Sequence, residues 1–282
     1  MLMDILYAIK INMNDFTKGE KRVAEYVLTH PSDVLHMSIS DLSDKCETGD
    51  TTVFRFCRTL NLNGYQEFKI HLAQSVSLHN ASGNPTGEAQ KDDLASVADR
   101  VLETSISSLN ETHSLLDLRK IEEAVNHFCQ ARTIRFFGMG ASYLSAQEAH
   151  YKFLRITDNT SCVMDPHFQA MAAALMTPED VAVVFTHSGS SKDAIHILKT
   201  LRQTGCYIIC ITRFKKSPAT ELSDIVLLCG DNEAPMQGGS FSARIAQLYI
   251  TDVIYSEYCR LNPDKVSRNQ IATSSVVANK LL

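Results

Sequence analysis

The sequence lacks several features by which other classes of protein are recognised. It has no tryptophan, and only seven prolines and twelve glycines in 282 residues. Only 21% of its residues are charged while 44% are hydrophobic, so a globular core is expected rather than disorder. No apolar run approaches the roughly 18 to 20 residues that a membrane-spanning helix needs. The first ten residues, MLMDILYAIK, carry an early acidic residue and no small-residue cleavage site, unlike a secretory signal. We therefore expect a cytoplasmic protein with no membrane partner.

The cysteines also lack a pattern. There are eight, with no C-x-x-C pair and no Cys/His cluster of zinc-like spacing, so we expect no metal site and no cofactor. Most stand in apolar stretches, where a free thiol behaves as a small hydrophobic group. We expect these cysteines to be buried and reduced.

Excess positive charge is absent as well. The chain has 27 Lys and Arg against 32 Asp and Glu, and residues 1–78 carry eight against ten. Bulk electrostatics therefore argues against nucleic-acid binding. Any such surface must arise locally, and residues 51–78 do contain Arg55, Arg58 and Lys69 against Glu67 alone.

A polar segment divides the chain. Residues 79–93, HNASGNPTGEAQKDD, contain almost nothing that could enter a core, and they predict a linker. The division leaves a small N-terminal domain, 1–78, and a large C-terminal domain, 94–282.

The C-terminal part alternates short apolar runs with amphipathic stretches. We expect buried strands at 133–137, 181–186, 206–212 and 225–228, a weaker one at 161–164, and helices near 94–113, 117–130, 192–203 and 240–260. This alternation predicts a parallel sheet with helices on both faces, a three-layer α/β/α fold.

The N-terminal part predicts an all-α domain of short helices. Thr17 and Glu20 form a capping box, and Ser38 with Asp41 marks a second helix start. A break at 47–49 precedes a third helix, in which Val53, Phe56, Cys57 and Leu60 form one apolar face. The span 38–60 therefore has the parts of a helix-turn-helix: a short helix, a turn with a glycine, and a second helix.

In a helix-turn-helix the second helix enters the major groove with its N-terminal residues at the base edges. The candidate DNA-binding residues at the start and on the outward face of this helix are Asp50, Thr51, Thr52, Arg55 and Arg58. Arginine can read guanine or pair with phosphate, and threonine can contact a thymine methyl or a phosphate. The alternative is a small helical bundle with a solvated polar face.

Two loops of small residues follow strands and open helices. They are Gly138-Met-Gly-Ala-Ser142 and His187-Ser-Gly-Ser-Ser191. Backbone amides in such a loop, at a helix N-terminus, favour an anion, and the serines add neutral donors. Residue 143 is tyrosine, so the dinucleotide pattern G-x-G-x-x-G is broken, and no G-x-x-x-x-G-K-[ST] loop is present. The alternative is that these serines only cap helices.

Residues 38–73, SISDLSDKCETGDTTVFRFCRTLNLNGYQEFKIHLA, resemble the N-terminal domain of RpiR-type (MurR/RpiR) regulators, with Gly49 standing where that family often has a serine. The pair GMGAS and SGSS resembles the SIS (sugar isomerase) domain, which binds phosphosugars. The resemblance implies that Ser142, Ser188, Ser190 and Ser191 hold a phosphate. It also implies that His167, in DPHFQ, contacts the sugar, and that Glu233 lies at the site.

These observations favour a regulator that is not an enzyme. It would act as a homodimer or higher homo-oligomer on a palindromic operator in double-stranded DNA, repress genes of sugar or amino-sugar catabolism, and respond to a phosphosugar. The resemblance suggests a hexosamine phosphate, such as N-acetylmannosamine 6-phosphate from sialic acid breakdown. The alternative is a phosphosugar isomerase or lyase, for which Glu148, His167 and Glu233 are the available bases. That reading leaves the N-terminal helices unexplained.

Overall fold

The computed structural model describes residues 5–82, 93–230 and 241–278, so Glu233 lies outside the described residues. The chain divides into two compact units, and the division falls after Glu103, within helix α7 (Leu94–Leu115). Each unit has a hydrophobic core of its own. None of the described helices combines the length and the apolar composition needed to cross a bilayer.

The first unit is helical. Its described helices are α1 (Ile5–Ile11), α2 (Lys18–Thr29), α3 (Pro31–Leu35), α4 (Ile39–Lys45), α5 (Asp50–Thr59) and α6 (Tyr65–Ser82). Phe56 of α5 is fully buried, with its ring centroid 5.1 Å from that of Phe16 and 5.4 Å from that of Phe68. These aromatic contacts fix α5 against the rest of the unit. Helix α6 continues to Ser82, past residue 79, where the sequence predicts the linker to begin.

Two side chains of α6 fix the segment that leads into α4. The Tyr65 hydroxyl donates to the carbonyl of Met37 over 3.2 Å, and Lys69 Nζ donates to the carbonyls of Met37 and Leu35 over 3.1 and 3.3 Å. Lys69 is buried, so its charge depends on these carbonyls and on the Tyr65 ring, 5.4 Å away. Substituting Lys69 would therefore loosen the entry to the helix-turn-helix.

The second unit is built on a five-stranded, all-parallel sheet in the order β2-β1-β3-β4-β5. The strands are β1 (Ile134–Gly138), β2 (Thr160–Cys162), β3 (Val181–Phe185), β4 (Tyr207–Thr212) and β5 (Ile225–Leu228). Strand β3 is buried along its whole length, as its continuous apolar run predicts.

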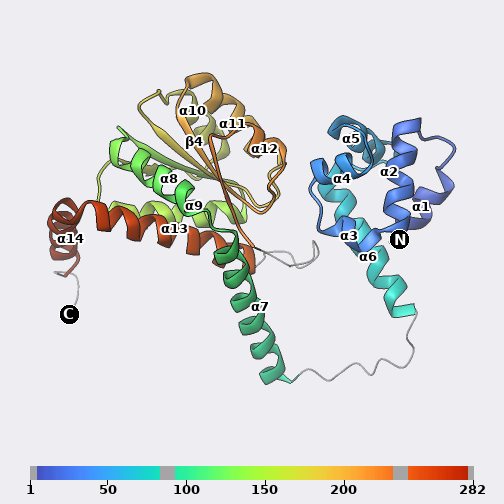
Figure 1. The fold of residues 1–282 in the computed structure, drawn as a ribbon, viewed down its shortest axis with the longest axis horizontal. Coiled ribbons are helices and arrows are strands. Elements are labelled where there is room, and N and C mark those ends of the chain that lie inside the picture. The colour runs from blue at the N-terminus through green and yellow to red at the C-terminus, as the bar shows by residue number, and fades with distance from the viewer. Residues whose placement is uncertain (1–4, 83–92, 231–240, 279–282) are drawn as a thin grey trace. The chain divides into compact units, whose positions relative to one another are not determined.

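Helices cover both faces of this sheet (Figure 1). One core joins the sheet to α8 (Leu118–Gln130), α9 (Ala141–Leu154) and α13 (Phe241–Leu261), and the other joins it to α10 (Pro166–Ala174), α11 (Lys192–Thr204) and α12 (Pro218–Glu221). Helix α14 (Pro263–Ala278) follows α13. The three-layer α/β/α fold predicted from the sequence is thus confirmed.

The cysteines only partly match the expectation of burial. All eight are free thiols; five are buried, Cys162 and Cys259 are half-buried, and Cys129 is exposed. The exposure of Cys129 corrects the prediction that the cysteines are buried. Cys129 lies one residue from the end of amphipathic α8 and points away from the core. Burial raises the pKa of Cys57 and of Cys210 to about 12, so these thiols stay protonated and inert.

Candidate functional site

The two small-residue loops lie on either side of the point where the strand order of the sheet reverses. Strand β1 is hydrogen-bonded to β2 on one side and to β3 on the other, with Gly138 opposite Phe185 at their carboxyl ends. Helices α9 and α11, which the loops open, belong to the cores on opposite faces of the sheet. Ligands of open α/β sheets bind in the crevice at such a point. The loops 138–142 and 187–191 are therefore placed to share one ligand.

The first loop is tight and depends on glycine. A Cβ on Gly138 would lie 2.4 Å from the backbone oxygen of Ser142, which is a steric overlap. Gly140 has φ +57°, in the left-handed region that favours glycine, and stands at the N-cap of α9 with no side-chain cap. Because of these glycines, the loop backbone can run close to the first turn of α9, which contains the half-buried Ser142.

The second loop is held from behind by the start of α12. Gly189 has φ +61°, and a Cβ there would lie 2.2 Å from Ser217 Oγ. The Ala219 amide donates to the Gly189 carbonyl over 2.9 Å, and Thr212 Oγ1 donates to the His187 carbonyl over 3.2 Å. The backbone of this loop is therefore fixed before any ligand binds.

The serines of the second loop differ in their contacts. The hydroxyls of Ser188 and Ser190 lie 3.3 Å apart, and the Ser190 amide also donates to Ser188 Oγ over 3.3 Å. Ser191 instead caps α11, where its hydroxyl accepts from the Ala194 amide over 3.3 Å. Ser188 and Ser190 thus form a pair of neutral donors, while Ser191 serves first as a helix cap.

A buried glutamine connects the DPHFQ segment to the first loop. Gln169 Nε2 donates to the Gly138 carbonyl over 3.0 Å, and Gln169 Oε1 accepts from the Gly138 amide over 3.3 Å. His167 lies two residues earlier, in the first turn of α10, with its side chain exposed. Asp165 caps this turn by accepting from the His167 amide over 2.8 Å. The segment that contains His167 is therefore tied to the β1 end of the crevice.

Sequence reasoning missed one basic segment beside the second loop. Neither loop contains a lysine or arginine, but Arg213, Lys215 and Lys216 directly follow β4. The Arg213 amide donates to the His187 carbonyl over 3.2 Å, which places this segment against the loop. The strand order is the feature that would have revealed this segment, because the pairing of β3 with β4 brings residues 213–216 next to the second loop.

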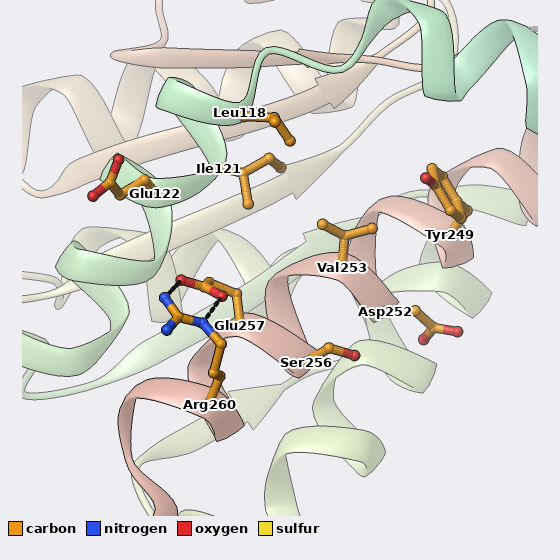
Figure 2. Close-up of a pocket in the computed structure, with 9 residues that line it drawn as sticks. All are labelled: Leu118, Ile121, Glu122, Tyr249, Asp252, Val253, Ser256, Glu257 and Arg260. Atoms are coloured by element: carbon orange, nitrogen blue, oxygen red, sulfur yellow. Dashed lines mark hydrogen bonds and ion pairs between the residues drawn. The ribbon is translucent and has the colours of Figure 1, made fainter.

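A groove of about 730 Å³ lies elsewhere, between α8 and α13 (Figure 2). Apolar side chains, among them Leu118, Ile121 and Val253, line its wall. Its charged residues are three carboxylates and Arg260, whose Nε and Nη2 already bind Glu257 over 2.7 and 2.6 Å. This pairing lowers the pKa of the Glu257 carboxyl. A groove with excess negative charge does not suit a phosphosugar, so the loops remain the candidate anion site.

In the first unit, α4, the turn at 46–49 and α5 form the expected helix-turn-helix. Both predicted capping boxes are present; in the second, Ser38 Oγ accepts from the Asp41 amide over 3.0 Å. The left-handed residue of the turn is Glu47, with φ +48°, whereas Gly49 has φ −100° and is the N-cap of α5. The glycine in the turn thus serves as an uncapped helix start rather than as the left-handed corner.

The candidate DNA-binding residues fall into two groups. Thr51, Arg55 and Arg58 are exposed. Thr52 is half-buried, and its methyl group lies 2.9 Å from where a Cβ on Gly19 of α2 would stand. The Asp50 carboxylate, which the sequence suggests is on the outward face, instead accepts from Ser40 Oγ over 2.7 Å and Ser43 Oγ over 2.5 Å. Asp50 thereby joins α5 to α4.

The two arginines are presented differently. Arg58 donates to Asn63 Oδ1 over 3.4 Å and lies 5.3 Å from the centroid of the Phe54 ring, so its orientation is set by its own helix and the following turn. Arg55, one turn closer to the N-terminus of α5, is exposed. Both project from the outward side of α5, opposite the buried Val53 and Phe56.

Comparison with known proteins assigns both units. Residues 3–79 match the helix-turn-helix domain of the rpiR family, and residues 127–256 match the SIS domain. An HTH-type transcriptional regulator of Haemophilus influenzae is 32% identical over 97% of this chain and 96% of its own length. The chain belongs to the RpiR family of transcriptional regulators.

Two further similar proteins agree with this assignment. The regulator HexR of Pseudomonas aeruginosa is 31% identical over 90% of this chain and 88% of its own. Among solved structures, the Vibrio vulnificus NanR protein complexed with ManNAc-6P superimposes with a TM-score of 0.86 at 27% identity, covering 98% of this chain and 99% of the other. The chain is therefore a DNA-binding transcriptional regulator with a sugar-phosphate-binding SIS domain.

Proposed function

We propose that this protein represses genes of amino-sugar catabolism and that a hexosamine phosphate, such as N-acetylmannosamine 6-phosphate, relieves the repression. The observation that carries the proposal is the pair of serine-bearing loops on both sides of the β1–β3 switch point. In this proposal Ser142, Ser188 and Ser190 bind the phosphate and His167 contacts the sugar.

Three features support a sugar phosphate over a nucleotide, and the last of them points to an acetylated sugar. Two helix N-termini and neutral hydroxyls suit a compact dianion. The GxGxxG and Walker patterns are absent from the sequence. The relative NanR was solved with ManNAc-6P. The basic residues after β4, Arg213 first, would add the positive charge that the loops lack.

Calorimetric titration tests the effector. The panel contains the 6-phosphates of N-acetylmannosamine, N-acetylglucosamine and glucose, together with ribose 5-phosphate and inorganic phosphate. We expect the acetylated hexosamine phosphates to bind most tightly. Binding of only the pentose phosphate or the plain hexose phosphate would rule out the proposed sugar class while leaving the loop site in place.

Selection from a random DNA library tests the other partner. Because one helix-turn-helix makes few base contacts, we propose that two copies bind a two-fold symmetric operator. We expect the selected sites to be inverted repeats. Sites without two-fold symmetry would contradict this arrangement.

A further inference from the structure

The first turns of α2 carry the densest group of cations in the first unit. Residues 1–78 contain eight Lys and Arg, and three of these, Lys18, Lys21 and Arg22, stand within five consecutive residues. At positions i, i+3 and i+4 they share one side of the helix. Lys18 and Arg22 are exposed, and Lys21 is half-buried. We call these three residues the α2 cluster.

The carboxylate within this stretch is withdrawn from the surface. Glu20 is 5% exposed, and it accepts from the Thr17 amide over 2.8 Å as one half of the capping box. Its charge is therefore used at the helix start. Exposed carboxylates flank the cluster, with Asp15 before the helix and Glu25 after Arg22. Between these two the surface charge of the chain is positive.

The α2 cluster lies beside the start of α5. Helix α2 packs on α5 (Figure 1), and a Cβ on Gly19 would stand 2.9 Å from the Thr52 methyl carbon and 3.7 Å from that of Thr48. Glycine at position 19 therefore allows the first turn of α2 to approach the first turn of α5. Arg22 lies at the same place, because its guanidinium pairs with Glu47, in the turn before α5, over 3.3 Å.

The start of α5 itself is poorly suited to phosphate. Its N-cap, Gly49, has no side chain, and Asp50 places a carboxylate at the helix end. The N-terminal residues of a recognition helix lie at the base edges, so the phosphates that border the groove pass close to this helix end. Positive charge for these phosphates has to come from a neighbouring element, and α2 supplies it.

We propose that the α2 cluster binds the phosphate backbone of DNA at the border of the groove that α5 enters. The inference rests on the proposed operator binding through the helix-turn-helix. Lysine and arginine contacts to phosphate fix the register of a protein on the duplex and carry no sequence information. The arginines of α5 then read bases, while the α2 cluster holds the helix in place.

The salt dependence of DNA binding tests the proposal. Fluorescence anisotropy of the full-length chain is measured at several salt concentrations, on the inverted repeat recovered by selection and on a scrambled duplex of equal length. We expect Lys18→Gln and Lys21→Gln each to weaken binding to both duplexes by a similar factor. Each should also reduce the slope of log K against log salt concentration by about 0.9 per bound copy, the value for one lost phosphate contact.

The matched control is Lys10→Gln, which removes one exposed charge from α1 of the same unit and should keep the wild-type slope. Lys18→Arg and Lys21→Arg should also keep it. Slopes in the glutamine variants equal to that of Lys10→Gln, or a loss of affinity confined to the operator, overturn the proposal. Arg55→Ala is the reference for base reading. If it binds both duplexes like the wild type while the lysine variants weaken, α5 is not the reading helix but the phosphate contact stands.

A second measurement needs no variant. The wild type is acetylated with an N-hydroxysuccinimide ester, with and without a saturating amount of the scrambled duplex at low salt, and the modified lysines are identified by mass spectrometry. We expect DNA to slow acetylation of Lys18 several-fold and to leave Lys10 unchanged. Equal rates at Lys18 with and without DNA overturn the proposal.

Discussion

At the scale of single residues, adjacent serines in the second loop have different tasks. The Ser191 hydroxyl accepts a hydrogen bond from the Ala194 amide, whereas the Ser190 hydroxyl donates to the Ser188 hydroxyl. Composition alone made the serines equivalent, since each follows a strand and precedes a helix. Their hydrogen bonds distinguish a serine that caps a helix from a serine that is a candidate phosphate-binding residue.

We expect Ser190→Ala to weaken phosphosugar binding about tenfold or more, because a hydrogen bond to a charged group contributes roughly 1.5–3 kcal/mol. Calorimetry with N-acetylmannosamine 6-phosphate measures the change. Thr200→Ala, on the helix α11 that follows the loop, with its hydroxyl bonded to the His196 carbonyl, is the control and should leave affinity unchanged. Equal affinity in Ser190→Ala and wild type would remove Ser190 from the site.

For the DNA surface, Arg55→Ala should weaken operator binding by roughly 1–3 kcal/mol if the arginine reads a base. Arg58→Ala should also weaken it, since its guanidinium is already oriented by Asn63 and Phe54. Fluorescence anisotropy with the selected operator measures both. Arg119→Ala, an exposed arginine of α8 in the other unit, is the charge-matched control. Wild-type affinity in both α5 variants would mean that α5 is not the reading helix.

At the scale of elements, the strands were predictable because burial on both faces makes each a continuous apolar run. Four predicted strands agree with the structure to within a residue or two, and the weak one, 161–164, is the short edge strand β2. Helix α10 was not predicted, since an apolar helix without a polar side has no 3.6-residue period. The contacts of Gln169 and Arg213 were not predicted for another reason. They depend on which strands are neighbours, and a single sequence does not specify the strand order.

The turn of the helix-turn-helix provides a test of backbone strain. Glu47 has φ +48°, a conformation that asparagine adopts more readily than other side chains with a Cβ. We expect Glu47→Asn to be more stable than Glu47→Ala by about 0.5–1 kcal/mol, because both lose the exposed ion pair with Arg22 and differ chiefly in tolerance of this conformation. Urea unfolding of the two variants makes the comparison. Equal midpoints would show that the turn relaxes when Glu47 is replaced.

At the scale of the whole molecule, we expect a saturating phosphosugar to lower operator affinity. Coupling between two sites is typically 1–3 kcal/mol, or roughly 5–150-fold. Anisotropy titrations of wild type and Ser190→Ala, with and without the ligand dose that saturates the wild type, measure it. A mutant that responds as the wild type does would show that the phosphate binds elsewhere. Tighter DNA binding with ligand would contradict induction but leave the site standing.

The variant Gln169→Leu tests whether the hydrogen bonds between α10 and the first loop carry the response to ligand. Because Gln169 touches Gly138 rather than the operator, we expect this variant to keep its ligand-free operator affinity. It should lose most of the response to ligand, even when the dose is raised to saturate it. A full response in this variant would mean that the signal does not pass through α10.

The carboxylate at the start of α5 affects how the protein distributes itself over genomic DNA. Asp50 places a negative charge at the helix end that would otherwise attract phosphate, and residues 1–78 carry more acidic than basic side chains. Binding to arbitrary sequence relies on release of counterions by cationic side chains, and here few are present. We therefore expect random DNA to retain little of the regulator. A larger share of its copies would then stay available for the operator among the vast excess of competing sites.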